Sequence, residues 1–251
     1  MSLPRPPRAK LRAVSRQLSK HVEDQHRAKQ GNALRAAVLG ANDGLVSNLS
    51  LVMGVAGASL GREEILITGL AGLIAGSCSM AMGEWVSVTS ARELMQRELS
   101  VERRELEDSP AEERDELIAI YESKGLTREQ ATAIADSLMA NPAAALDTHA
   151  REELGIDPDD LGGSPWQAAG ASFLLFCIGA IPPIIPYVFV GGATAVILSL
   201  VLSGIALFAI GALITRLTDR SPLKSGARQL AIGFAAAAVT FGVGAAIGTV
   251  V

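Results

Sequence analysis

Five long apolar segments dominate the hydrophobic pattern of this 251-residue chain. They cover residues 34–60, 65–91, 166–190, 193–215 and 229–251. At about 1.5 Å of rise per helical residue, each is long enough to cross a hydrocarbon core of about 30 Å. The pattern therefore predicts an all-α integral membrane protein with five transmembrane helices.

Prolines interrupt the third apolar segment at Pro182, Pro183 and Pro186. Proline in a membrane helix frees backbone groups, which neighbouring protein must then satisfy. We therefore expect a kink over 182–186 inside a packed bundle. Only Gly191 and Gly192 separate this segment from the next, so a fused third and fourth span is the alternative to five.

The polar stretch between the second and third apolar segments carries several helix start signals. These are Ser109-Pro110-Ala111-Glu112, Thr127-Arg128-Glu129-Gln130, Asn141-Pro142 and Asp157-Pro158. Each pairs a capping residue with an N1 proline or with a Glu or Gln three residues later. We predict a helical insert, 92–165, between two membrane parts that cover 34–91 and 166–251.

Charge is distributed unevenly along the chain, although 22 Lys and Arg nearly balance 26 Asp and Glu. Residues 1–35 carry a net +7, residues 216–228 carry +3 and residues 92–161 carry −11. Cytoplasmic flanks of membrane helices are enriched in Lys and Arg. With five spans, the N-terminus, the 216–228 loop and the acidic insert face the cytosol, and the C-terminus lies outside. A bacterial-type cell membrane is our default location.

The basic N-terminal segment, 1–33, has no apolar region of the kind found in a secretory signal. Leu11, Val14, Leu18 and Val22 recur at helical spacing among basic residues. This pattern fits an amphipathic helix on an anionic leaflet and equally a disordered basic tail. A transit peptide is a third interpretation.

Glycine is abundant, with 25 residues, whereas only 4% of residues are aromatic. Small residues four apart let membrane helices approach closely. Candidate contacts are Gly40/Gly44, Gly57/Gly61, Gly72/Gly76 and Gly244/Gly248. Both cysteines, Cys78 and Cys177, fall inside apolar segments, so the pattern excludes a disulfide framework.

Two acidic residues and a methionine mark the first two apolar segments. Asp43 has Ser47 and Ser50 on the same helical face, and Met80 lies four residues before Glu84. Counted from the segment ends, Asp43 and Met80 both fall in the cytosolic half of the bilayer. A carboxylate and a thioether together suit a first-row transition ion. The alternatives are a protonated aspartic acid that bonds a neighbouring helix and a methionine that only packs.

The insert carries two Glu-x-x-Glu pairs, one on either side of a predicted turn. Glu102/Glu105 and Glu113/Glu116 should lie on antiparallel helices whose glutamate faces meet, and Glu153 could join them from the last helix. Clustered carboxylates repel one another unless cations bind. The alternative is an ordinary solvated surface that Arg103, Arg104 and Arg114 neutralise.

The chain resembles the vacuolar iron transporter family over residues 34–251. The resemblance rests on GANDGLVSNLSLVMGVAGA at 40–58, AGLIAGSCSMAMGEWVSV at 71–88, the acidic helical insert, ALDTHAREELG at 145–155 and the proline-rich third segment. It implies five transmembrane helices and a homodimer with the ion path at its two-fold interface. It also implies export of cytosolic Fe²⁺ or Mn²⁺ in exchange for protons, and a cytosolic metal-binding insert.

The resemblance also implies residue roles. Asp43 and Met80 match the membrane ion site. Glu102, Glu105, Glu113, Glu116 and Glu153 match the cytosolic ligands. Better-known members carry two methionines where this chain has His149 and Ala150. An imidazole ligand also accepts Zn²⁺, so ion preference stays open, as does a solvated surface role for His149.

Proton exchange has a separate physical basis in the two membrane acids. An acid in a dry span must bind a cation or a proton, so Asp43 and Glu84 are candidate exchange sites. We expect the partners to be divalent metal ions, protons, membrane lipid and a second copy of the chain, with no nucleic acid, no permanently bound cofactor and no enzymatic activity.

Two other functions compete with this interpretation. One is a membrane-anchored iron-binding or ferroxidase-like storage protein without transport. Residues 92–161 lack the Glu-x-x-His motif of ferritin-like di-iron sites. The other is a transporter of organic solutes, for which the sequence shows no aromatic-lined polar pocket.

Overall fold

A computed structural model describes residues 38–218 and 221–250, and these residues form helices and connections with no strand. The all-α prediction is confirmed. Contacts divide the chain into two units. The membrane unit contains the described residues up to Ala81 and from Gly170 onward, and the insert unit is Met82–Ala169. The predictions for residues 1–33 lie outside the described residues.

Among the described residues, four helices have the length and apolar composition needed to cross a membrane. They are Val38–Gly57, α2 (Arg62–Asp108), α8 (Gly192–Thr218) and α9 (Pro222–Gly248). The third predicted segment is occupied by the shorter apolar helix α6 (Pro165–Ala180) and by α7 (Ile185–Phe189). The chain is therefore an integral membrane protein.

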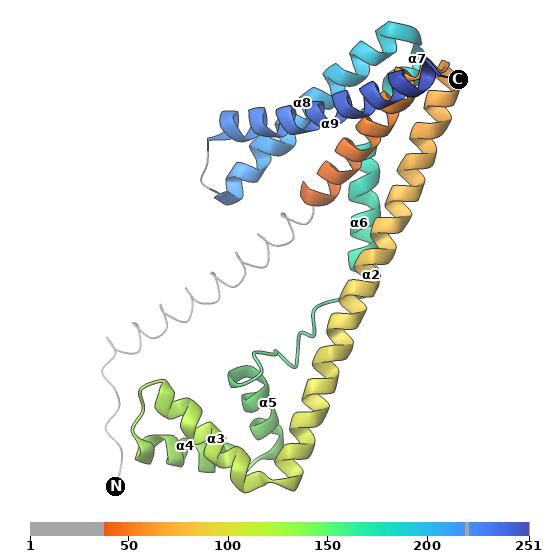
Figure 1. Cartoon of the computed structure of the whole chain (residues 1–251). Helices are drawn as coiled ribbons and strands as arrows, with labels where there is room; N and C mark the ends of the chain where they lie inside the picture. Colours follow the sequence, from red (N-terminus) through yellow and green to blue (C-terminus); the bar gives the residue numbers. More distant parts are fainter. Residues whose placement is uncertain (1–37, 219–220, 251) are drawn as a thin grey trace. The chain divides into compact units, whose positions relative to one another are not determined.

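The third segment is broken rather than kinked, so the expected single bent helix is wrong (Figure 1). Two consecutive prolines remove two N–H donors, and α6 ends before them at Ala180. Neighbouring helices satisfy two carbonyl groups at the break. Ser199 Oγ donates to Pro183 O at 2.8 Å, and Asn48 Nδ2 donates to Ala180 O at 2.7 Å. Protein groups thus supply donors to carbonyl groups at the break, as a membrane interior requires.

Glycine permits close contact between the helices of the membrane unit. A Cβ atom at Gly44 would overlap the backbone oxygen of Phe176 on α6. A Cβ atom at Gly244 on α9 would likewise overlap the backbone oxygen of Gly54. The Val38–Gly57 helix is therefore in close backbone contact with α6 at Gly44 and with α9 at Gly244. Its buried core residues include Leu45, Leu49, Val52 and Met53.

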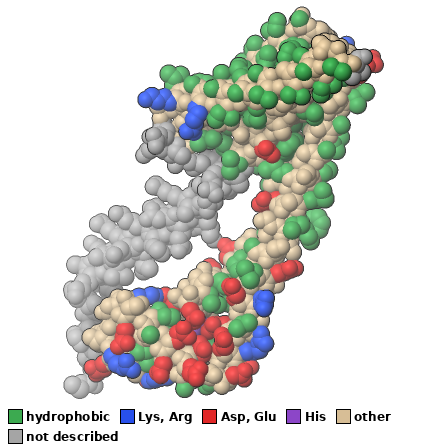
Figure 2. Space-filling model, in the orientation of Figure 1, with side chains coloured by type: hydrophobic (Ala, Val, Ile, Leu, Met, Phe, Trp, Pro, Cys, Tyr) green, Lys and Arg blue, Asp and Glu red, His purple; other side chains and the backbone are tan. Residues whose placement is uncertain are grey.

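The insert unit is built from the charged end of α2 and three short helices. These are α3 (Pro110–Ser123), α4 (Arg128–Met139) and α5 (Pro142–Glu152). α4 packs against α3 around Leu117, Ile118, Ala131 and Ala135, and it also contacts α5. Figure 2 shows acidic side chains gathered over this unit, in contrast to the apolar surface of α8 and α9.

The helix start signals of the insert had mixed outcomes. Thr127 and Gln130 form the predicted capping box, and Asn141 Oδ1 accepts from the first turn of α5. Ser109 precedes α3 without a side-chain cap bond. No helix follows Asp157, so that prediction is wrong. The Asp157 carboxylate instead accepts the backbone N–H of Asp159 at 3.1 Å, which closes a turn.

The expected antiparallel pairing of the glutamate helices is also wrong. α3 turns away from the end of α2 instead of lying along it (Figure 1). Only Ser109 separates the two helices, and a helical hairpin needs a loop of about two to five residues. The two Glu-x-x-Glu pairs therefore do not face each other as complete pairs.

Candidate metal sites

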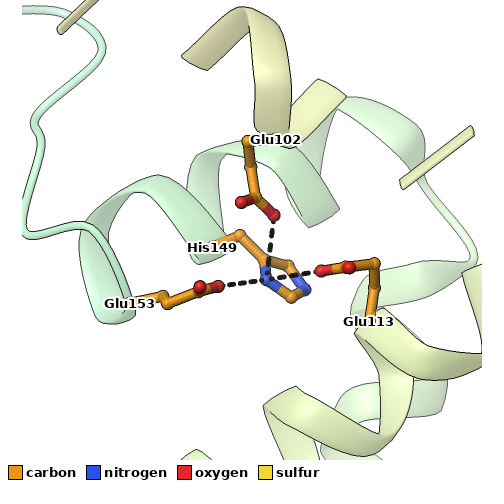
Figure 3. A group of neighbouring side chains, drawn as sticks. All are labelled: Glu102, Glu113, His149 and Glu153. Atoms are coloured by element: carbon orange, nitrogen blue, oxygen red, sulfur yellow. Dashed lines mark hydrogen bonds and ion pairs between the residues drawn. The ribbon is translucent and has the colours of Figure 1, made fainter. Parts of the chain in front are cut away.

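Four potential ligands from three helices converge in the insert unit. Glu102 comes from α2, Glu113 from α3, His149 from α5 and Glu153 from the end of α5 (Figure 3). One ligand atom of each lies within 4.8 Å of the others. Ligands bound to one ion at about 2.0–2.4 Å lie at most twice that distance apart. The spacing of this glutamate–histidine cluster suits a single metal ion.

The cluster has more acceptors than donors. His149 Nδ1 lies 3.1 Å from Glu102 Oε1, 3.1 Å from Glu153 Oε2 and 3.5 Å from Glu113 Oε2. Nδ1 carries at most one proton, and only its contact with Glu153 has hydrogen-bond geometry. Glu102 Oε1 and His149 Nε2 are buried without a hydrogen-bond partner. A bound cation would satisfy the carboxylate oxygens that one proton cannot.

Burial sets the protonation of the cluster. His149 is fully buried, and Glu102 and Glu113 are 3% and 7% exposed. Desolvation, followed by repulsion from Glu153, raises the pKa of Glu102 to about 7. Desolvation also raises the pKa of Glu113. Two of the three carboxyl groups therefore hold protons more tightly than ordinary glutamates, and a metal ion would displace these protons on binding.

Local sequence explains how α5 presents two of the ligands. His149 and Glu153 are four residues apart, so they share one face of the helix. Asn141 caps the start of α5, and Gly155, with a φ of 66°, ends it in the left-handed region. The Ile156 N–H donates to Ala150 O at 2.7 Å across this end. Caps at both ends thus fix the turn that holds His149.

Two predicted ligands lie outside the cluster. Glu105 lines a neighbouring cavity of about 330 Å³, whose lining also includes Glu102 and Glu153. Glu116 acts on Glu113 through charge, because its repulsion adds to the rise in the pKa of Glu113. Each Glu-x-x-Glu pair thus contributes one ligand and one nearby charge.

Two of the three arginines expected to neutralise a solvated glutamate surface, Arg104 and Arg114, bind other groups. Arg114 pairs with Asp136 at 2.5 Å and with Asp115 at 3.2 Å. Arg104 Nε donates to Ser100 O at 3.1 Å. Within residues 38–215 and 221–250, whose side chains the structure describes, no arginine or lysine forms an ion pair with a carboxylate of the cluster. This arrangement favours a cation site over a neutralised surface.

The membrane unit contains a cavity of about 340 Å³ that brings Asp43 and Met80 together. The Val38–Gly57 helix, α2 and α6 form it. Its full lining is Asp43, Ser47, Asn48, Leu51, Gly72, Gly76, Ser79, Met80 and Phe176. A charged oxygen, several neutral oxygens and a thioether therefore face one space between apolar helices. Such a donor set can hold a divalent transition ion.

Three further polar residues of the apolar segments differ in their placement. Glu84 follows Met80 by one helical turn on α2 and is half-buried, but it belongs to the insert unit. Ser50 does not line the membrane cavity. Asn48 does line it and was missed by the sequence analysis. The signal that could have identified Asn48 is its polar amide inside an apolar segment, five residues after Asp43.

The fold and the two sites define a class of protein: an all-helical integral membrane protein with a carboxylate–thioether cavity among its spans and a carboxylate–imidazole cluster in a polar insert. The sequence matches the model of the VIT family over residues 34–245. The chain belongs to the VIT family.

Relatives match over most of their length. The "Vacuolar iron transporter" of Acanthamoeba castellanii is 39% identical, over 88% of this chain and 82% of that protein. The "Vacuolar iron transporter 1" of Oryza sativa subsp. japonica is 31% identical over 92% of both chains. The "Vacuolar iron transporter homolog 1" of Arabidopsis thaliana is 35% identical, over 94% of this chain and 96% of that protein.

Proposed function

We propose that this protein transports Fe²⁺ or Mn²⁺ out of the cytosol in exchange for protons. The observation that carries the proposal is the membrane cavity that Asp43 and Met80 share. An isolated carboxylate in a membrane span costs about 3 kcal/mol or more, so it needs a cation or a proton. The family membership and the relatives named as iron transporters support iron as the transported ion.

The glutamate–histidine cluster has the role of a cytosolic collecting site in this proposal. Its ligands lie in the acidic insert, and its spacing suits one ion. Carboxylates with one imidazole accept Fe²⁺ and Mn²⁺, and they also accept Zn²⁺. The cluster concentrates divalent ions near the membrane, and the membrane cavity carries them across.

The proposal includes a homodimer with the ion path at its two-fold interface. Asp43 and Ser47 line the membrane cavity and are both exposed in a single chain. An exposed carboxylate at this depth would face acyl chains unless protein covers it. A second copy that packs over this face would enclose the cavity and shield Asp43 from lipid.

Flux measurements in liposomes test the transport proposal. The full-length protein is reconstituted with a metal-sensitive dye and a pH dye inside the vesicles. We expect Fe²⁺ and Mn²⁺ uptake that moves protons in the opposite direction. Asp43→Asn removes the charge at nearly constant size, so uptake should be lost while the protein keeps its oligomeric state. Undiminished uptake by this variant, or uptake without proton movement, would contradict the proposal.

The ferroxidase-like alternative makes a different prediction for the same preparation. Di-iron oxidation needs two ions held side by side, whereas the cluster groups four ligands at the spacing of one ion. Oxygen-dependent conversion of Fe²⁺ to Fe³⁺ by the protein, without uptake into vesicles, would favour the storage function.

A further inference from the structure

Asn48 places a buried amide at the membrane cavity. Its side chain is 2% exposed, and its Nδ2 atom donates to Ala180 O at 2.7 Å. A backbone carbonyl can only accept, so the NH₂ group must face Ala180. This bond therefore fixes the orientation of the amide, and the Oδ1 atom points away from α6.

The Oδ1 atom of Asn48 is buried without a hydrogen-bond donor. A Cβ atom built on Gly72 would lie 2.9 Å from this oxygen, and Gly72 lines the same cavity. The same Cβ atom would overlap Leu51 Cδ2, so a side chain at position 72 would displace both neighbours. The glycine thus leaves room for the amide oxygen of Asn48 among residues that line the cavity. A buried acceptor with neither a donor nor an ion is costly to maintain in an apolar interior.

We propose that Asn48 supplies a neutral oxygen ligand to the divalent ion bound by Asp43 and Met80. This inference rests on the proposed transport function. The aspartate would contribute charge, the methionine a soft sulfur and the amide a hard oxygen. Carbonyl oxygens favour harder ions such as Mn²⁺ over soft ones. Asn48 would therefore set ion preference without adding charge, so the exchange with protons would not depend on it.

Two substitutions separate a ligand from a packing residue in full-length protein in liposomes. Asn48→Leu keeps the branched shape of the side chain and removes the oxygen, and we expect the KM for Mn²⁺ to rise about tenfold, as for loss of one good polar contact. Asn48→Met replaces the oxygen by a second thioether, and we expect uptake of the softer Cd²⁺ to rise relative to Mn²⁺. That ratio does not depend on the fraction of protein that folds.

Matched serine variants on α8 control for lost packing and lost hydrogen bonds. Ser199→Ala removes another buried bond to a carbonyl, that of Pro183. Ser203→Ala removes another buried oxygen that has no partner and lies outside the cavity. Both should keep the Mn²⁺ KM and the Cd²⁺ to Mn²⁺ ratio of the unsubstituted protein.

The outcomes distinguish this inference from the transport proposal. An unchanged Mn²⁺ KM in Asn48→Leu, or an unchanged ion ratio in Asn48→Met, would overturn the ligand role of Asn48. If Asp43→Asn abolishes uptake in the same experiment, the transport proposal stands without a ligand role for Asn48. If Asp43→Asn transports normally, the transport proposal fails first.

Discussion

Glu102 illustrates how one buried carboxyl group couples metal binding to pH. It lies on the polar end of α2, is 3% exposed and faces His149. Burial raises its pKa from 4.5 to about 7. The folded protein therefore favours the protonated acid, whereas a metal ion requires the carboxylate. Protons and metal ions thus compete for the same oxygen.

Metal binding at the cluster should strengthen as pH rises towards 7. Below pH 7, each proton that the metal displaces weakens the apparent affinity about tenfold per pH unit. Above that pH the dependence should level off, because Glu102 is already ionised. Calorimetric titration of the full-length protein with Mn²⁺ over this pH range measures the effect. An affinity that does not change between pH values well below and above 7 would contradict the assignment.

Without metal, the same pKa shift predicts the opposite trend for stability. A folded-state pKa above the unfolded value favours the folded state most below pH 4.5, and this contribution is lost as pH rises to about 7. Glu102→Gln, which resembles the protonated acid, should remove this part of the dependence and weaken metal binding. Thermal unfolding without metal at several pH values provides the control.

At the scale of elements, glycine spacing decides how closely the membrane helices pack. Gly244 and Gly242 both lie on α9, but their surroundings differ. A Cβ atom at Gly244 would overlap the backbone oxygen of Gly54, whereas one at Gly242 would meet nothing within 4 Å. A backbone oxygen cannot rotate away as a side chain can, so only the Gly244 position requires the helices to separate.

Gly244→Ala should therefore destabilise the membrane unit, and Gly242→Ala should not. Overpacking at close contacts typically costs about 1–3 kcal/mol. Alanine at an uncrowded helical site is favoured over glycine by about 1 kcal/mol in aqueous helices. Thermal unfolding of the two purified variants in the same detergent compares them directly. Equal melting temperatures for both variants would show that α9 does not contact the Val38–Gly57 helix at Gly244 as described.

At the scale of the whole molecule, a single chain combines an apolar unit with an acidic one. α2 supplies residues to both units, and its 47 residues correspond to about 70 Å of helix. A hydrocarbon core is about 30 Å thick, so the charged part of α2 must lie in water. The charge pattern predicts that this water is the cytosol.

Cysteine labelling tests that topology. In a chain that carries Cys78→Ser and Cys177→Ser, Lys124→Cys in the insert and Leu60→Cys before α2 provide single thiols. Both parent side chains are exposed. A membrane-impermeant maleimide should label Lys124→Cys only in inside-out vesicles and Leu60→Cys only in right-side-out vesicles. The reverse pattern would invert the proposed direction of transport.

Local sequence was sufficient for the features that depend on neighbouring residues. Apolar length alone predicted the membrane helices, because a helix satisfies its own backbone in lipid. The Thr127 capping box and the Asn141 cap depend on residues within one turn, and both formed as predicted. Proline positions predicted where the third segment is interrupted, although not that the helix would stop there.

Only the tertiary structure decided which residues meet. Glu102, Glu113 and His149 lie on three helices, and the angle between α2 and α3, set by a one-residue connection, selected one glutamate from each pair. Asn48 gained its role from Ala180, which is distant in sequence and orients its amide. The physical reason is that caps and apolar periodicity act along the chain, whereas ligand geometry depends on contacts between segments that no local pattern specifies.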